Sequence, residues 1–223
     1  MQWVWERVQA IEGTDAVVAT DDQRIADAAS GFGASAMLTS ADCQSGTDRC
    51  GEVLRRMGKD YDVVVNVQGD EPFVDPKQLH DLMATFSDPC VQIATLRTRI
   101  TGNDELASAN NVKVVCDDKG NALYFSRQPI PYRRDVPFDQ WLDKGDYYKH
   151  VGVYAYRSAT LERLSSLPVG YLEACEKLEQ LRWLAAGYTI RTVETGHANI
   201  GIDTPDDLAE AERYIKENKL FTI

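Results

Sequence analysis

The fold is decided by residues 61–72, YDVVVNVQGDEP. Residues 61–67 form a nearly continuous apolar run, which is typical of a central strand in a parallel sheet that is covered on both faces. Residues 68–72, QGDEP, come next, at the carboxyl end of the predicted strand, where open α/β sheets place their ligands. This stretch therefore predicts a central strand with a ligand site directly after it.

Apolar runs with strand character alternate with helical patterns on both sides of this stretch. The predicted strands are residues 15–19, 35–38, 61–67, 91–96, 112–117, 122–126, 147–156 and 189–193. The predicted helices are residues 3–11, a segment over 20–29 with capping-box spacing at its start, a segment that Ser45 or Thr47 caps, residues 172–187, and a last helix after Thr204. We expect an α/β fold with a doubly wound, mostly parallel sheet and an inserted β-rich arm at about 112–156, within a single domain spanning 1–223.

The composition argues against several classes of protein. Lys and Arg number 24 against 35 Asp and Glu, a net charge of −11, which disfavours nucleic acid or an anionic membrane as the main partner. No apolar run approaches the roughly 20 residues that span a bilayer, and the first residues do not form a signal peptide. The five cysteines include no C-x-x-C pair, so we expect a reducing, cytoplasmic compartment.

Two separate segments carry carboxylates that suit a divalent metal ion. Asp70 and Glu71 directly follow the strongest strand, and Asp203 precedes the Thr-Pro-Asp-Asp start of the last helix. The helix dipole does not explain Asp203, because this residue lies before the helix cap. Mg²⁺ is typically held by one or two such ligands together with substrate phosphates. The alternative is that residues 68–72 are only a polar turn, since Gly, Asp and Pro favour turns.

A loop that leads into a helix provides a second candidate site. Residues 44–49, QSGTDR, combine free backbone N–H groups, the small Gly46 and an arginine, Arg49, one turn into the helix. This arrangement suits a phosphate or a nucleotide. An ordinary helix cap at Ser45 explains the same spacing.

Polar residues in the second half of the chain have both functional and structural interpretations. His150 and Tyr154 lie on one face of a predicted strand and suit either a sugar or the core. Arg127 follows a strand and suits a carboxylate through its guanidinium fork. The polar residues of 171–187 lie off the apolar stripe, which is typical of a solvated helix face. They are Glu173, Glu176, Glu179, Gln180 and Arg182.

The motifs taken together resemble a known family. They are DCQSGTDR (42–49), VNVQGDEP (65–72), LYFSR (123–127), HVGVY (150–154), LEQL (178–181) and GIDTP (201–205). In this order, and over essentially the whole chain, they are similar to the CMP-Kdo synthetases, the 3-deoxy-manno-octulosonate cytidylyltransferases. Each motif alone is modest, but the ordered set is specific.

The resemblance implies the transfer of CMP from CTP to the anomeric hydroxyl of Kdo with loss of pyrophosphate, for lipopolysaccharide synthesis. It implies CTP and Kdo as substrates, Mg²⁺ as cofactor and a homodimer formed through the arm. By motif, the nucleotide contacts are Ser45, Gly46 and Arg49, and the Mg²⁺ ligands are Asp70 and Asp203. Gln68 faces the sugar or the nucleotide, and the Kdo pocket is lined by His150, Tyr154, Glu179 and Gln180, with Arg127 a weaker candidate.

One departure from the family concerns the start of the chain. Members begin with a strand and a basic, glycine-containing loop whose Arg and Lys side chains bind the triphosphate. This chain starts after that loop, near where the first helix of the family begins. We therefore expect weak or no activity from these residues alone.

Three other functions share features with this interpretation. A CMP-sialic acid synthetase has the same fold and chemistry, and its preferred sugar acid distinguishes it. A GT-A glycosyltransferase also uses a nucleotide and a metal carboxylate, but it releases no pyrophosphate. A truncated protein that binds a nucleotide, or pairs with a full-length partner, catalyses nothing.

Overall fold

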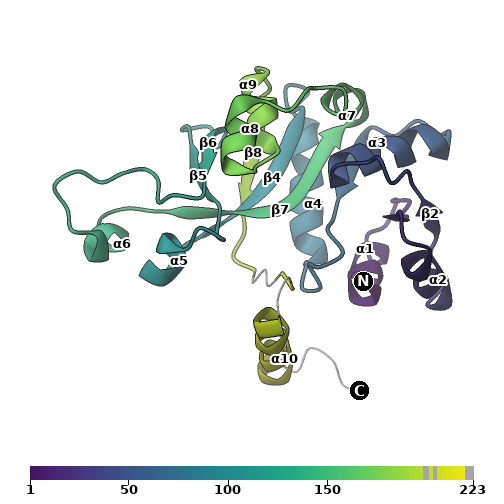
Figure 1. Cartoon of the computed structure of the whole chain (residues 1–223), viewed down its shortest axis with the longest axis horizontal. Coiled ribbons are helices and arrows are strands. Elements are labelled where there is room, and N and C mark those ends of the chain that lie inside the picture. Colours follow the sequence, from purple (N-terminus) through teal and green to yellow (C-terminus); the bar gives the residue numbers. More distant parts are fainter. Residues whose placement is uncertain (198–200, 203–204, 219–223) are drawn as a thin grey trace.

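The computed structural model describes residues 1–197, 201–202 and 205–218 (Figure 1). Its strands are β1 (Val18–Thr20), β2 (Ala36–Leu38), β3 (Val63–Asn66), β4 (Ile93–Arg99), β5 (Lys113–Cys116), β6 (Ala122–Ser126), β7 (Tyr148–Arg157) and β8 (Ile190–Glu194). Its α-helices are α1 (Gln2–Gln9), α2 (Gln23–Gly31), α3 (Gly46–Met57), α4 (Pro76–Ala84), α5 (Asn103–Ala107), α6 (Trp141–Lys144), α7 (Ser158–Leu164), α8 (Tyr171–Glu176), α9 (Gln180–Ala185) and α10 (Pro205–Asn218). Short 3₁₀ helices cover Thr85–Ser87 and Phe138–Gln140.

The long strand β7 organises the main sheet. It pairs antiparallel with β3, β4 and β5, while β4 pairs parallel with β8 and β5 pairs antiparallel with β6. Among the described strands of this sheet, β3, β4, β5 and β8 therefore run in one direction, and β6 and β7 run in the other. The predicted α/β fold with a mostly parallel sheet is confirmed, and β7 is the antiparallel strand inserted between the parallel ones.

Alternation along β7 separates two apolar cores. Tyr154 and Tyr156 belong to a core with side chains from α3, α7 and α9, whereas Val151, Val153 and Ala155 belong to a core with side chains from α1 and α4. Successive strand residues point to opposite faces, so helices cover both sides of the sheet. Figure 1 shows this arrangement, with α9 in front of the sheet and α4 behind it.

Strands β1 and β2 form a separate parallel pair beside the main sheet, and α3 contacts both β1 and β3. Figure 1 shows this pair with α2 at the right of the molecule. Helix α2 starts later than the capping-box spacing from Thr20 predicts. Its N-cap is Asp22, whose carboxylate accepts from the Arg24 N–H at 2.8 Å. Thr20 cannot be the cap because it is still part of β1.

The segment between β6 and α6, with α6 itself, extends away from the rest of the molecule, to the left in Figure 1, whereas β5 and β6 belong to the main sheet. A small core of Ile100, Leu106, Trp141 and Tyr147 supports it. Strand β7 then leads back into the centre of the main sheet, where it pairs with β3 and β4. The last part of the predicted arm, about 112–156, thus runs through the main sheet itself.

Residues 172–187 are two helices and not the one that the periodicity predicts. Lys177 adopts a left-handed conformation with φ of 55°, which ends α8, and Glu179 starts α9. An ion pair of 2.6 Å between Glu173 and Arg182 bridges the break, and the two side chains are only 12% and 11% exposed. The prediction of a solvated helix face is therefore wrong, because the break turns these charged groups toward each other.

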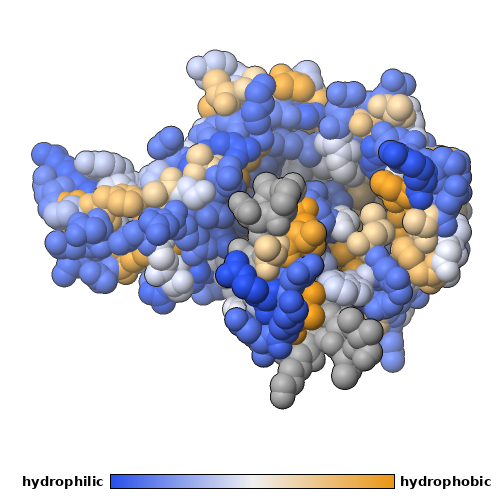
Figure 2. All heavy atoms as spheres, turned by 60° about the horizontal axis from the view of Figure 1, so that its bottom comes forward, coloured by the Kyte–Doolittle hydropathy of each residue, from blue (hydrophilic) through white to orange (hydrophobic). Residues whose placement is uncertain are grey.

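The surface in Figure 2 is largely hydrophilic, with apolar side chains in small groups. In the described part of the chain, no helix is long and apolar enough to cross a membrane.

Removing side-chain volume from β4 should destabilise the fold strongly. Leu96 is fully buried beside Ala94 and Val151. We expect Leu96→Ala to lower the free energy of unfolding by about 2–5 kcal/mol, because transfer and cavity costs add. Urea denaturation measures this, with Leu38→Ala as the matched strand control. Leu38 of β2 is 41% exposed, so a similar loss in the control would contradict the assigned core.

Candidate active site

The candidate site lies at the carboxyl end of β3. Asn66, the last residue of this strand, pairs with Tyr154 of β7 and is buried. Beside it begin α3 and α9, two helices that are far apart in the sequence and are joined here by side-chain hydrogen bonds. Among the described strands β3 pairs only with β7, and its valines are half-buried, so the central strand predicted here is an edge strand of the main sheet. The predicted position of the site, directly after this strand, still brings several of the predicted residues together.

Ser45 caps α3, as the spacing predicts. Its hydroxyl accepts from the Asp48 N–H at 3.2 Å and donates to the Glu179 carboxylate at 2.9 Å. Gly46 follows, and a Cβ at this position would lie 2.9 Å from the Asn66 side-chain nitrogen. A glycine is therefore needed for the start of α3 to approach the end of β3 this closely.

Glu179 is the most constrained charged group in the site. Its second carboxylate oxygen accepts from the Thr47 hydroxyl at 3.0 Å, and the Arg182 guanidinium lies 3.9 Å away. Burial raises the pKa of Glu179, and the hydrogen bonds from Ser45 and Thr47 oppose that rise. The Glu179 carboxylate already lies at the N-terminus of α3. Beside it, the neutral hydroxyl groups of a ligand, which donate hydrogen bonds, fit better than a second anionic group.

His150 and Tyr154 share one face of β7, as predicted, with ring centroids 5.1 Å apart. The Thr95 hydroxyl donates to the Val153 carbonyl at 2.8 Å, so it accepts from His150 Nε2–H at 2.9 Å. With the proton on Nε2, the neutral form of the imidazole has its acceptor at Nδ1. Desolvation lowers the pKa of His150 to about 3. Tyr154 is buried against Trp183, with ring centroids 5.1 Å apart.

The loop after β3 carries Gln68 and Asp70. The Gln68 side chain lies over β7, because a Cβ on Gly152 would be 3.9 Å from its amide nitrogen. The Asp70 carbonyl accepts from the Ile202 N–H at 2.9 Å. Asp203 lies outside the described residues.

Protein acceptors hold the two predicted arginines. The Arg49 guanidinium binds the Thr39 hydroxyl at 2.5 Å and Asp21 at 3.3 Å, which ties α3 to the end of β1. Arg127 donates from its side chain to the carbonyls of Glu176 and Ala109, at 2.8 and 3.0 Å. Arg127 therefore fastens the end of β6 to α8. Gln180, at the start of α9, is buried.

Thr47, Asn66 and Tyr156 belong to this site although the sequence analysis did not single them out. The Thr47 and Tyr156 hydroxyls are 3.3 Å apart, and both residues are buried. Asn66 did leave a signal, because it is a polar residue within an apolar strand run. The sequence analysis passed over Thr47 because it belongs to a helix-cap motif, and over Tyr156 because aromatic residues recur along its strand.

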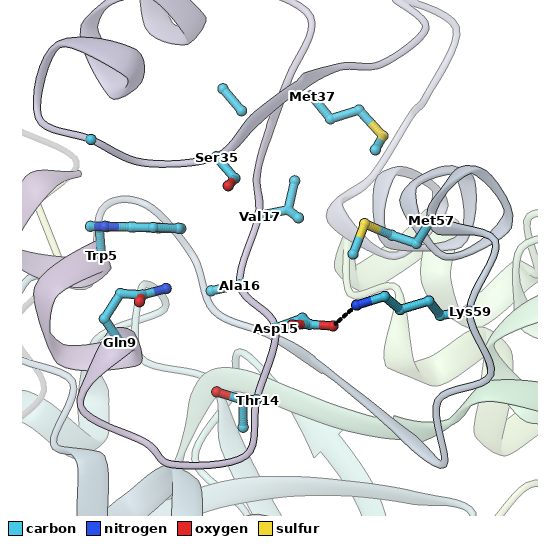
Figure 3. A pocket seen from close by; sticks show the side chains of 12 residues that line it. Trp5, Gln9, Thr14, Asp15, Ala16, Val17, Ser35, Met37, Met57 and Lys59 are labelled. Carbon is cyan, nitrogen blue, oxygen red and sulfur yellow. Dashed lines mark hydrogen bonds and ion pairs between the residues drawn. The ribbon is translucent and has the colours of Figure 1, made fainter.

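A cavity of about 480 Å³ lies elsewhere, between α1, the strands β1 and β2, and the end of α3 (Figure 3). Trp5, Met37 and Met57 line it, and an ion pair of 2.8 Å joins Asp15 to Lys59 at its side. No predicted site residue is among those that line it.

Within the described ranges, no group of three or more His, Cys, Asp or Glu side chains is arranged to hold a metal ion. A Mg²⁺ ion held by two carboxylates and substrate phosphates needs no such group. Asp70 supplies one hard oxygen ligand of the required type, on the loop that Ile202 contacts.

A family model described as "Cytidylyltransferase" matches residues 1–192. Relatives from Bacteroides thetaiotaomicron and Phocaeicola vulgatus are each 49% identical, over 97% and 98% of this chain and 87% and 88% of their own length. Both are named 3-deoxy-manno-octulosonate cytidylyltransferase. The chain belongs to this family.

Solved structures agree with this assignment. A CMP:2-keto-3-deoxy-manno-octonic acid synthetase complexed with CTP is 40% identical, with a TM-score of 0.87 over 97% of this chain and 87% of that one. A 4-diphosphocytidyl-2C-methyl-D-erythritol synthase from Anaerococcus prevotii is 13% identical, with a TM-score of 0.62 over 96% of this chain and 88% of its own, and shows the shared fold alone.

Desolvation of His150, a half-buried residue, should make stability depend on pH. Its folded pKa of about 3 lies below the usual value of 6.5, so the unfolded state binds a proton that the folded state does not. The stabilisation is present above pH 6.5 and is lost as pH falls toward 3. Between pH 7.5 and 5 this removes up to about 2 kcal/mol from the free energy of unfolding.

Urea denaturation at the two pH values checks this. Between pH 7.5 and 5, the free energy of unfolding of His150→Gln should fall by up to about 2 kcal/mol less than that of the wild type. His80→Gln is the matched control, because the His80 side chain is 76% exposed. Equal pH dependence in all three proteins would show that His150 is not buried in its neutral form.

Proposed function

We propose that this chain transfers the cytidylyl group of CTP to Kdo, giving CMP-Kdo and pyrophosphate, as its relatives are named to do. One observation carries the proposal: the starts of α3 and α9, the end of β3 and one face of β7 meet in a single site. The similar structure in complex with CTP supports the nucleotide as a substrate. The names of the relatives favour Kdo over a sialic acid.

In the proposed reaction the Kdo 2-hydroxyl oxygen attacks the α-phosphorus of CTP in line with the leaving pyrophosphate. The new bond is sugar O–P, the bond that breaks is the α–β phosphoanhydride, pyrophosphate leaves, and the hydroxyl proton passes to solvent water. His150, Tyr154, Glu179 and Gln180 bind and orient the sugar, and Gln68 lies at its border. Fixing the hydroxyl beside the phosphorus lowers the entropic part of the barrier.

Asp70 and Asp203 are the proposed Mg²⁺ ligands. The hydrogen bond of Ile202 to Asp70 supports this, because Ile202 directly precedes Asp203. When bound, Mg²⁺ neutralises charge on the phosphoryl oxygens during transfer. It also offsets the negative charge of the chain at this edge.

A homodimer formed through the arm and a cytoplasmic location complete the proposal. Leu123 and Tyr132 are 62% and 78% exposed in the β5–α6 segment, which supports a contact with a second copy. Sedimentation of the chain and of Tyr132→Lys tests this, and a monomeric wild type would contradict it.

The rate of pyrophosphate release from CTP and Kdo should fall at least about 10²-fold in Asp70→Asn, the typical loss for one electrostatic contact to the reacting group. Calorimetry should show that CTP binding to the variant no longer responds to Mg²⁺. Asp60→Asn, at an exposed carboxylate, is the matched control. Wild-type turnover in Asp70→Asn would refute the metal role, and turnover with N-acetylneuraminate instead of Kdo would refute the sugar.

A further inference from the structure

A buried chain of hydroxyl groups ends on the Glu179 carboxylate. The Thr47 hydroxyl donates its one proton to Glu179 at 3.0 Å, so it must accept from the Tyr156 hydroxyl, which lies 3.3 Å away. Burial raises the pKa of Tyr156 well above its usual range, which keeps this group a donor. Thr47 and Tyr156 are 2% and 0% exposed, so water does not replace either group.

This chain restrains the carboxylate from one side, and Ser45 restrains it from the other. Ser45 donates to Oε1 and Thr47 donates to Oε2, and both belong to the first turn of α3, whereas Glu179 starts α9. A carboxylate offers about four acceptor positions, and these two hydroxyls fill two of them. The Glu179 side chain is 24% exposed, with the Arg182 guanidinium 3.9 Å from Oε1, so a further acceptor position can face a hydroxyl group of a ligand in an orientation that the two helices set.

The hydrogen bond from Thr47 to Glu179 joins the part of the candidate site expected to contact the nucleotide to the part expected to contact the sugar. Thr47 lies inside the motif expected to contact the nucleotide, but its hydroxyl points to a residue expected to contact the sugar. Loss of the Thr47 hydroxyl should therefore weaken the binding of the sugar, although the position of Thr47 in the sequence suggests an effect on the binding of the nucleotide.

We propose that Thr47 is a positioning residue for the sugar substrate: through its hydroxyl, supported by Tyr156, it holds the Glu179 carboxylate in the orientation that accepts hydrogen bonds from the Kdo hydroxyl groups. This rests on the proposed function, because it takes Kdo as the ligand of Glu179. Thr47→Val keeps the shape of the side chain and removes the donor. The freed carboxylate oxygen then turns toward water or toward Arg182, and the sugar loses its fixed acceptor.

The test compares Kdo and CTP affinities in matched variants. Kdo is titrated by calorimetry into the chain saturated with CTP in the presence of EDTA, and the KM values for both substrates are measured with Mg²⁺. We expect Thr47→Val to weaken Kdo binding and raise the Kdo KM about 10- to 100-fold, as for loss of a hydrogen bond to a charged group. The CTP KM should change less than about 3-fold.

Two further variants separate positioning from folding. Thr47→Ser restores the hydroxyl and should recover the Kdo affinity to within about 3-fold of the wild type. Tyr156→Phe keeps the Thr47 donor and should weaken Kdo binding by a smaller factor, so it carries the same test if Thr47→Val does not fold. Thr160→Val, at another buried threonine, is the control and should bind Kdo as the wild type does.

The outcomes that overturn the inference differ from those that overturn the function. Unchanged Kdo affinity in a folded Thr47→Val, or equal losses for Kdo and CTP that Thr47→Ser does not rescue, would show that Thr47 serves only the fold. A wild-type chain that neither binds Kdo nor releases pyrophosphate with it would overturn the proposed function, and this inference with it.

Discussion

The pairing of β7 with β3 and β4 is the constraint on which the rest of the structure depends. It places Tyr154 beside both Asn66 and Thr95, so the end of β3 and one aromatic face of β7 share a site. The opposite face of β7 is closed by the core under α1 and α4. Because side chains alternate along a strand, one register sets both the core and the site, and a shift by one residue would exchange them.

In and near the candidate site, each charged or titratable side chain that is withdrawn from water needs a partner or must remain neutral. The Glu179 carboxylate is tolerated because hydroxyl groups from another helix donate to it and Arg182 is near. Glu173 and Arg182 are tolerated because each is the partner of the other. His150 avoids the cost by remaining neutral. The Glu179 contacts join α9 to α3, and the pair of Glu173 and Arg182 joins α8 to α9, so these charged groups also fix the packing of the helices around the site.

Local patterns predicted the elements whose signals are local. The strand at β3, the Ser45 cap of α3 and the shared face of His150 and Tyr154 follow from neighbouring residues alone, and the structure confirms them. The central place predicted for β3 is wrong, because among the described strands it pairs only with β7. The break at Lys177 did not follow. Both sides of it keep leucines at helical spacing, and the ion pair of Glu173 with Arg182 that forms across the break is a contact that no local pattern marks. The assignment of Asp70 and Asp203 to one metal ion stays a prediction.

The sequence by itself determined the α/β class, the place of the site after β3 and the family, since period, composition and ordered motifs are properties of the chain. The tertiary structure alone decided that Thr47 acts on Glu179, that Arg49 is bound to Asp21, and that Arg127 fastens α8. These contacts join residues that are distant in the sequence. Which donor reaches which buried acceptor depends on how helices pack on the sheet, and no local pattern encodes that packing.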